Sequence, residues 1–113
     1  MPTMITAVIR PYALDDVKTA LKAATVSGMT VTEVRGHGRQ GGHTETYRGT
    51  EYQVDLMPKV KVEAVVPDAE VAELVEALGE AAGSGKIGDG KIWVSSLASI
   101  SRIRTGESGD TAV

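Results

Sequence analysis

The sequence predicts an α+β domain with the ferredoxin-like plan, in which two βαβ halves place both helices on one face of an antiparallel sheet. Three observations support this prediction. Strand-like and helix-like patterns alternate as β-α-β twice along the chain, a long polar stretch separates the two halves, and 113 residues fit a single domain, residues 1–113. The other face of such a sheet needs a cover, and a partner subunit is the simplest one.

The first half begins with an apolar run at residues 4–10, which predicts a strand that is covered on both faces and ended by Pro11. A helix is expected next, because apolar residues recur there with helical spacing. The apolar stripe consists of Leu14, Val17, Leu21 and Ala24. Gly28 is expected to end this helix, and the β-branched residues 29–35 are expected to form the second strand.

Residues 36–55 form a connection, here called the arm, of about twenty residues, well above the usual four to six. Its first seven positions contain four glycines, and it shows neither the apolar period of a strand nor that of a helix. Its side chains are mostly polar and offer little that could pack. We therefore expect an irregular loop that contacts another molecule and contributes little to the core.

In the second half, alternation of apolar and mostly polar side chains over residues 58–66 predicts a strand with one buried face. Its expected buried residues are Val60, Val62, Ala64 and Val66. A helix is predicted to start at Pro67, with Asp68 as its N-cap, and to end at the glycines of residues 83–85. The buried stripe of this helix is expected to consist of Val71, Leu74, Val75 and Leu78.

The end of the chain is predicted to contain a fourth strand at residues 91–95, a short fifth at residues 100–104, and a mobile polar tail from Gly106. On an extended chain, Arg102 and Arg104 would point to the same side, and the planar fork of arginine suits phosphate oxygens. The glycines of residues 83–90 leave backbone N–H groups free to bind an anion next to the positive charge of Lys91. Together these features predict an anion-binding site.

Two familiar nucleotide-binding motifs are present only in part. Residues 36–41 match the glycine spacing of the dinucleotide fingerprint, but the arm follows them instead of the helix that would hold a pyrophosphate. Residues 85–91 match most of a P-loop, but Ile92 replaces the Ser or Thr that binds Mg²⁺. Neither motif is accepted.

Composition excludes several classes of protein. Cysteine is absent, so the chain has no disulfide or thiolate metal site, and a net charge of −3 argues against direct nucleic-acid binding. No apolar run approaches the length of a membrane span, and no signal-peptide pattern is present, so we expect a cytoplasmic protein. His37 and His43 on the arm are expected to be solvated, because two histidines alone fall short of a structural metal site.

Two stretches resemble the signatures of one family. Residues 47–52, Tyr-Arg-Gly-Thr-Glu-Tyr, and residues 84–93, which end in Gly-Asp-Gly-Lys-Ile-Trp, are similar to both signatures of the PII nitrogen-regulatory signal proteins. Further agreement is spread over the chain, at residues 14–17, 28–34, 38–40, 42–45 and 102–107. The resemblance covers about residues 4–107, and the chain is identified as a member of this family, of the actinobacterial type.

The resemblance implies a homotrimer of ferredoxin-like subunits in which ATP and ADP compete for three clefts between subunits. By this resemblance, residues 36–55 correspond to the family's T-loop, residues 83–91 to its B-loop, and residues 97–113 to its C-loop and tail. The implied nucleotide contacts are Thr30, Gly38, Arg39, Gln40, Glu63, Val65, Gly88, Asp89, Gly90, Lys91, Arg102 and Arg104. Of these, Arg102 and Arg104 are expected to reach the phosphates from the neighbouring subunit.

The resemblance also implies an effector and a modification. Mg²⁺ would be held by the ATP phosphates and Gln40, and 2-oxoglutarate by Gln40, the backbone of Gly41 and Gly42, and the Lys59 ammonium. Tyr52 is the expected nucleotidylylation site, with Tyr47 as the competing acceptor, and UMP and AMP both remain open.

The expected partners are a nucleotidyltransferase and, through the T-loop and Arg48, an ammonium transporter or nitrogen-metabolism enzymes and regulators. A transporter would recruit the protein to the membrane.

Three positions depart from the family pattern: Gly41 replaces the usual Lys, Thr50 the usual Ala or Ser, and Tyr12 the usual Phe. Whether Thr50 accepts a phosphate stays open. Two other classes of protein compete with a regulator. One is a nucleotide-dependent enzyme, but the sequence shows no nucleophile–base pair of the kind that catalysis would require. The other is a trimeric metal-binding protein that shares the fold.

Overall fold

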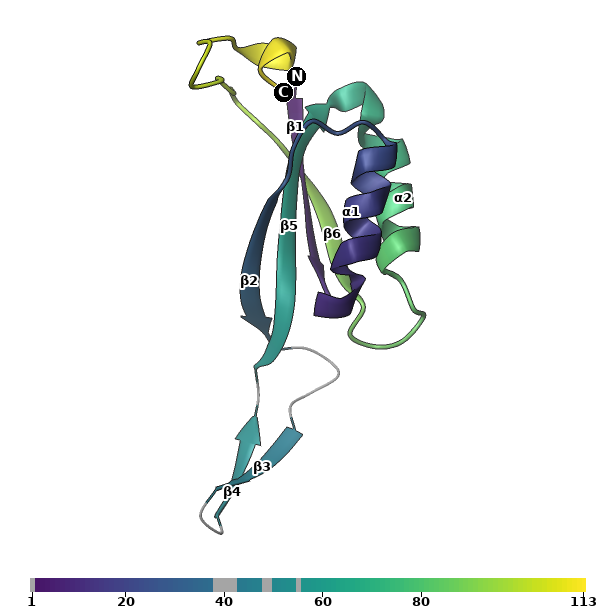
Figure 1. The fold of residues 1–113 in the computed structure, drawn as a ribbon, viewed down its shortest axis with the longest axis vertical. Coiled ribbons are helices and arrows are strands. Elements are labelled where there is room, and N and C mark those ends of the chain that lie inside the picture. Colours follow the sequence, from purple (N-terminus) through teal and green to yellow (C-terminus); the bar gives the residue numbers. More distant parts are fainter. Residues whose placement is uncertain (1, 38–42, 48–49, 55) are drawn as a thin grey trace.

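The computed structural model describes residues 2–37, 43–47, 50–54 and 56–113, and it describes residues 43–47 and 50–54 by their backbone alone. Within these ranges, a four-stranded antiparallel sheet carries two helices on one face, and a separate two-stranded hairpin lies beyond one end of the sheet (Figure 1). This arrangement confirms the predicted α+β ferredoxin-like fold.

The main sheet has the strand order β2-β5-β1-β6. Its strands are β1 (Pro2–Ile9), β2 (Thr30–Gly36), β5 (Met57–Pro67) and β6 (Gly90–Ser96), and the helices are α1 (Leu14–Ala23) and α2 (Val71–Ala82). The central strand β1 pairs with β5 on one side and with β6 on the other, so that Ala7 lies opposite both Val62 and Ile92. Its central position explains why nearly every residue of β1 is buried.

The core lies between the sheet and the two helices, and the predicted stripes are confirmed. Val17 and Leu21 of α1 and Leu74 and Leu78 of α2 are all at most 3% exposed. The flanking residues Leu14, Ala24, Val71 and Val75 pack against this core, and all four predicted inward residues of β5 are buried. Because the core formed by the described residues contains no aromatic side chain, close packing of Val, Ile, Leu and Ala supplies its stability.

The first helix begins and ends differently from the prediction. A 3₁₀ turn, Pro11–Ala13, leads into α1, and the helix ends at Ala23, with Ala24 as its C-cap, well before Gly28. The N–H groups of Thr25 and Val26 donate to the carbonyls of Lys22 and Leu21, which is the Schellman pattern. Thr25 occupies the left-handed position of this motif with φ 57°. Glycine is the usual residue there, so the sequence gives no warning of this end.

The second helix also differs at its start. A 3₁₀ turn, Asp68–Glu70, precedes α2, and no side chain caps either element, so the prediction of Asp68 as N-cap is wrong. The pairing of Pro2 with Pro67 brings Thr3 next to Asp68, and the Thr3 hydroxyl donates to the Asp68 carboxylate. This hydrogen bond is the main reason that the pKa of Asp68 is lowered. Gly83 follows α2 directly, as predicted.

The arm is more regular than the sequence indicated. It contains β3 (His43–Tyr47) and β4 (Thr50–Val54), which pair only with each other, and Glu45 lies opposite Tyr52. The prediction of an irregular loop is therefore wrong for these ten residues. Backbone pairing within a hairpin needs no buried apolar face, so a search for apolar periods does not detect it.

The C-terminal segment also corrects two predictions. Residues 100–104 form no strand: Ser101 makes an isolated bridge to Ser108, and a turn follows in which the Gly106 N–H donates to the Arg102 carbonyl over 2.8 Å. Gly109–Ala112 form a 3₁₀ turn whose Ala112 is buried, so this end of the chain is an ordered element. The premise that Arg102 and Arg104 share one side of an extended chain therefore fails.

Candidate functional site

The B-loop connects α2 to β6, and its path depends on glycine. Gly85, Gly88 and Gly90 have φ values of 80°, 100° and 108°, in the left-handed region that side chains disfavour. A Cβ atom on Gly90 would lie 1.8 Å from the Val8 carbonyl oxygen of the neighbouring strand. This position therefore requires glycine both for its conformation and for its close approach to β1.

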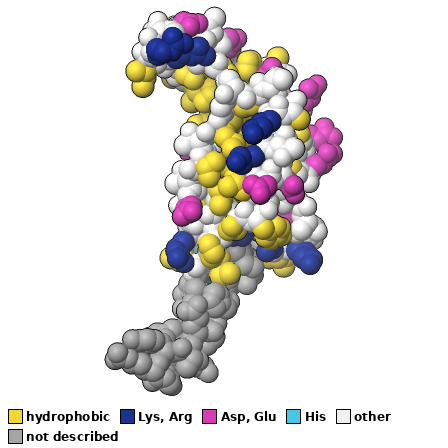
Figure 2. Space-filling model, in the orientation of Figure 1, with side chains coloured by type: hydrophobic (Ala, Val, Ile, Leu, Met, Phe, Trp, Pro, Cys, Tyr) yellow, Lys and Arg dark blue, Asp and Glu magenta, His cyan; other side chains and the backbone are white. Residues whose placement is uncertain are grey.

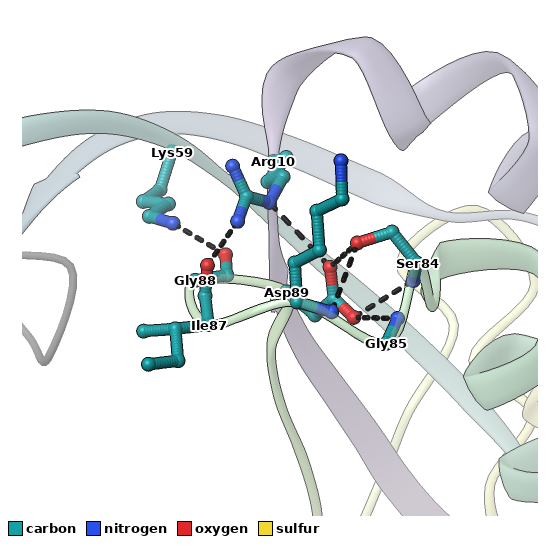
Figure 3. A network of polar contacts seen from close by, with 8 residues as sticks. Arg10, Lys59, Ser84, Gly85, Ile87, Gly88 and Asp89 are labelled. Atoms are coloured by element: carbon teal, nitrogen blue, oxygen red, sulfur yellow. Dashed lines mark hydrogen bonds and ion pairs between the residues drawn. The ribbon is translucent and has the colours of Figure 1, made fainter.

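Asp89 ties the two ends of the B-loop together. Its carboxylate accepts hydrogen bonds from the N–H of Ser84 at 2.7 Å, from the N–H of Gly85 at 2.9 Å and from the Ser84 hydroxyl (Figure 3). These bonds, the Ser84 contacts above all, lower the pKa of Asp89 to about 2. Asp89 is therefore ionised at neutral pH, and its carboxylate joins the start of the loop to its end.

Two cations from other strands hold the middle of the B-loop. Arg10, which follows β1, donates from Nη2 to the Ile87 carbonyl, and its Nε lies 3.5 Å from Asp89 Oδ1. Lys59 of β5 donates from Nζ to the Gly88 carbonyl over 2.7 Å, and both side chains converge on the loop in Figure 3. Burial lowers the pKa of Lys59, and the nearby Arg10 charge lowers it further.

A cleft of about 690 Å³ opens beside this loop, here called the B-loop cleft. It is lined by Val8, Gly36, His37, Lys59, Trp93 and residues 86–91. The backbone N–H groups of Ile87 and Gly88 find no acceptor among the described residues, and the Asp89 N–H faces only the Lys86 carbonyl across the tight turn at residues 87–88. Free N–H groups at left-handed glycines, with Lys59, Lys86 and Lys91 around them, have the chemistry of a site for a phosphate or another oxyanion.

A second cleft, of about 540 Å³, lies at the C-terminal segment. It is lined by Met4, residues 27–30, residues 63–65, Ile100, Arg102, Ala112 and Val113. Arg102 makes two contacts here: its Nη2 donates to the Val113 carbonyl over 3.0 Å, and its Nη1 lies 3.8 Å from Glu107 Oε1. We call this the C-terminal cleft.

The two clefts lie at opposite ends of β6. The strand starts at Gly90, beside the B-loop cleft, and its last residue, Ser96, leads toward the C-terminal segment. Seven extended residues span about 20 Å. Basic side chains gather on the C-terminal segment at the top of Figure 2 and again near the other end of the main sheet. One chain alone therefore does not bring Lys91 and Arg102 together.

The structure divides the predicted nucleotide residues into two groups. Gly88, Asp89, Gly90 and Lys91 line the B-loop cleft, together with the predicted effector residue Lys59. Thr30, Glu63, Val65 and Arg102 line the C-terminal cleft, whereas Arg104 is exposed and lines neither. Residues Gly38, Arg39, Gln40, Gly41, Gly42 and Arg48 lie outside the described residues, and for Tyr52 only the backbone in β4 is described.

Three residues of the site were missed by sequence reasoning. Arg10 holds the loop but reads in the sequence only as the polar end of an apolar strand. Ser84 was predicted as part of the B-loop but not as a partner of Asp89. Trp93 was predicted only as a strand residue, although it is 45% exposed and lines the B-loop cleft. The sequence offers one signal for Arg10: it is the charged residue at the end of an apolar strand, directly before Pro11.

Among the described helices, none has the length and apolarity that a membrane crossing requires. The described residues also contain no group of three His, Asp or Glu side chains placed to hold a metal ion.

Comparison with known proteins identifies the family of the chain. Residues 2–107 match the family model described as nitrogen regulatory protein P-II. The chain is 57% identical to nitrogen regulatory protein P-II 1 of Escherichia coli over 109 residues, which cover 96% of this chain and 97% of the relative. A nitrogen regulatory protein P-II of Pasteurella multocida is 56% identical with the same coverage. The chain therefore belongs to the nitrogen regulatory protein P-II family.

Proposed function

We propose that this chain reports the nitrogen and energy state of the cell by binding ATP or ADP together with 2-oxoglutarate. Proteins of its family are regulatory signal proteins and not enzymes. The observation that carries the proposal is the B-loop cleft, where unpaired backbone N–H groups lie among lysines. Such a cleft favours the phosphates of a nucleotide.

The position of the two clefts supports a site shared between subunits. The phosphate-binding group of residues and the group expected at the nucleoside lie at opposite ends of β6, so a complete site needs a second chain. The sheet face without helices offers a surface for that chain, because it carries the half-exposed Trp93 opposite Thr6, whose hydroxyl has no partner among the described residues. We therefore propose a homotrimer, in which Arg102 and Arg104 reach the phosphates of the neighbouring subunit.

The effector is proposed to bind beside the nucleotide. Lys59 lines the B-loop cleft with its ammonium group next to Gly88, where it could hold a carboxylate of 2-oxoglutarate. Gln40, Gly41 and Gly42 would complete this site, with Gln40 on a Mg²⁺ ion held by ATP. An amide oxygen, phosphate and carboxylate are the ligands that this hard cation prefers.

The arm is proposed to carry the signal to partners in the cytoplasm. Its hairpin forms a sheet of its own, so its conformation depends little on the main sheet. Arg48 would contact a partner such as an ammonium transporter, which would recruit the protein to the membrane. Tyr52 would be nucleotidylylated. Peptide mass mapping after a change in nitrogen supply is expected to find a nucleotidyl group on Tyr52; its presence only on Tyr47 would reject this site.

Calorimetric titration of 2-oxoglutarate tests the central claim. The effector is expected to bind tightly with Mg²⁺-ATP, and weakly with ADP or without nucleotide, because ADP lacks the γ-phosphate. Linkage requires that 2-oxoglutarate tightens Mg²⁺-ATP by the same factor. Gln40→Ala and Lys59→Ala should each weaken effector binding more than ATP binding. Equal effector affinity under all three conditions would refute the coupled sensor.

A further inference from the structure

Two successive carbonyl groups of the B-loop are each held by a cation from another strand. The Ile87 carbonyl accepts from Arg10, and the Gly88 carbonyl accepts from Lys59 over 2.7 Å (Figure 3). We propose that Arg10 and Lys59 are positioning residues which orient the N–H groups of Gly88 and Asp89 toward the phosphates of a nucleotide. This inference rests on the proposed function, because it assumes that the B-loop cleft holds phosphates.

The geometry of the peptide bond carries the argument. A trans peptide is planar, so its C=O and the N–H of the next residue point in opposite directions, and the described chain contains no cis peptide. A carbonyl of Ile87 that points to Arg10 therefore turns the Gly88 N–H away from Arg10. In the same way, a Gly88 carbonyl that points to Lys59 turns the Asp89 N–H away from Lys59.

The two N–H groups are thereby left available to bind a ligand. Among the described residues the Gly88 N–H donates no hydrogen bond, and the Asp89 N–H makes only a weak turn contact with the Lys86 carbonyl. The carboxylate of Asp89 is taken up by Ser84 and Gly85. Carbonyl oxygens facing a phosphate would repel it, and here two of them are already occupied by cations. The loop is thus fixed before the ligand arrives, which reduces the entropy lost on binding.

Arg10 and Lys59 are well placed for this task and constrained to it. Lys59 is only 9% exposed, and Arg10 Nε is buried beside Asp89. A Cβ atom on Gly88 would lie 2.6 Å from Arg10 Nη2. The guanidinium therefore fills the space directly against the loop, and a free lysine on the surface could not replace it. Arg10 also contacts two groups at once through separate nitrogens of its rigid guanidinium, the Ile87 carbonyl through Nη2 and Asp89 through Nε.

The test uses ADP as the probe and the full chain in its native assembly. Arg10→Met and Lys59→Met are each expected to weaken ADP binding at least tenfold in calorimetry. Arg10→Lys should recover part of the loss, since it keeps one donor. Lys22→Met, which removes the same charge from an exposed position on α1, is the matched control and should bind ADP as the wild type does.

A second readout separates positioning from simple charge. In ¹H–¹⁵N spectra of the free protein, the amides of Gly88 and Asp89 should shift in Arg10→Met and Lys59→Met. They should stay in place in Lys91→Met, which removes a cleft charge whose side chain holds neither loop carbonyl but is still expected to weaken ADP binding. Wild-type ADP affinity in Arg10→Met, or unmoved amides in both methionine variants, would overturn the inference.

The outcomes also distinguish this inference from the function on which it rests. A wild-type protein that fails to bind ADP or ATP would refute the proposed function itself. Should Arg10→Met not fold, Arg10→Lys and Lys59→Met decide the question: full ADP affinity with unmoved Gly88 and Asp89 amides in both rejects a positioning role.

Discussion

The guanidinium of Arg102 donates a hydrogen bond to the backbone carbonyl of Val113, with 3.0 Å between Nη2 and the oxygen. Arg102 therefore holds the C-terminal 3₁₀ turn in place within its own subunit, whereas Arg104 is exposed and makes no hydrogen bond or ion pair within the described chain. The two arginines were expected to act as a pair, but the structure gives them different surroundings.

Replacing each arginine should reveal this difference. Both Arg102→Ala and Arg104→Ala are expected to weaken ATP and ADP binding at least tenfold, because a charge-assisted hydrogen bond contributes about 1.5–3 kcal/mol. Only Arg102→Ala should also speed amide exchange at Val113 and at Ala112, since Arg102 contacts that end of the chain and Arg104 does not. Calorimetry and hydrogen exchange measure the two effects. Unchanged nucleotide affinity in both variants would reject their phosphate role.

The carboxylate of Asp89 should make stability depend on pH in the acid range. Its pKa is lowered from 3.8 to about 2 by hydrogen bonds from Ser84 and Gly85. A group whose pKa is depressed by folding stabilises the folded state above its unfolded pKa and loses that contribution as the pH falls toward the folded value. The melting temperature of Asp89→Asn should therefore lie below that of the wild type at pH 6, and the gap should close between pH 3.8 and pH 2.

Thermal unfolding at fixed protein concentration measures this gap, because assembly makes the melting temperature depend on concentration. A constant difference between the wild type and Asp89→Asn across the whole pH range would contradict the assignment to the Asp89 carboxylate.

The arm should be dispensable for stability. Its hairpin pairs with no strand of the main sheet, so deletion of residues 44–50 is expected to change the free energy of unfolding by no more than about 0.5 kcal/mol, the usual range for surface changes. Binding to partners should be lost. Differential scanning calorimetry and a binding assay with a purified partner measure both effects. A large loss of stability on deletion would mean that the arm packs against the domain.

Thr25 should be improved by glycine. It occupies the left-handed position at the end of α1 with φ 57°, where a side chain costs about 1–2 kcal/mol. Thr25→Gly is therefore expected to stabilise the protein by about 1 kcal/mol in urea unfolding, even though it removes the hydroxyl bond to the Ala24 carbonyl. Thr19→Gly inside α1 is the matched control and should destabilise by about 0.3 kcal/mol, since Gly is a poorer helix former than Thr. If both substitutions change the stability in the same direction, the left-handed conformation of Thr25 is not the reason for the effect.

The sequence was sufficient wherever structure depends on local periodicity. Residues 58–66 alternate, so their buried face was predictable, and the spacing of Val17, Leu21, Leu74 and Leu78 identified the inner faces of both helices. The signatures at residues 47–52 and 84–93 identified the family, because each combines glycine with charged and aromatic residues in a fixed order.

Predictions from local sequence patterns were wrong where a different interaction determined the structure. Asp68 bonds Thr3 of a neighbouring strand instead of capping a helix, and the left-handed conformation of Thr25 ends α1 without a glycine. Hairpin pairing in β3 and β4 uses backbone groups, which every residue carries, so polar side chains conceal it.

Only the tertiary structure could show how the B-loop is held. Arg10 and Ile87 are 77 positions apart in the sequence, and Lys59 and Gly88 are 29 apart. Their contacts exist because β1 pairs with both β5 and β6, which brings the ends of three strands to one place. A local pattern records which groups a chain carries and how often they recur. The direction in which a carbonyl points, and the cation that meets it, depend on strand pairing over the whole domain.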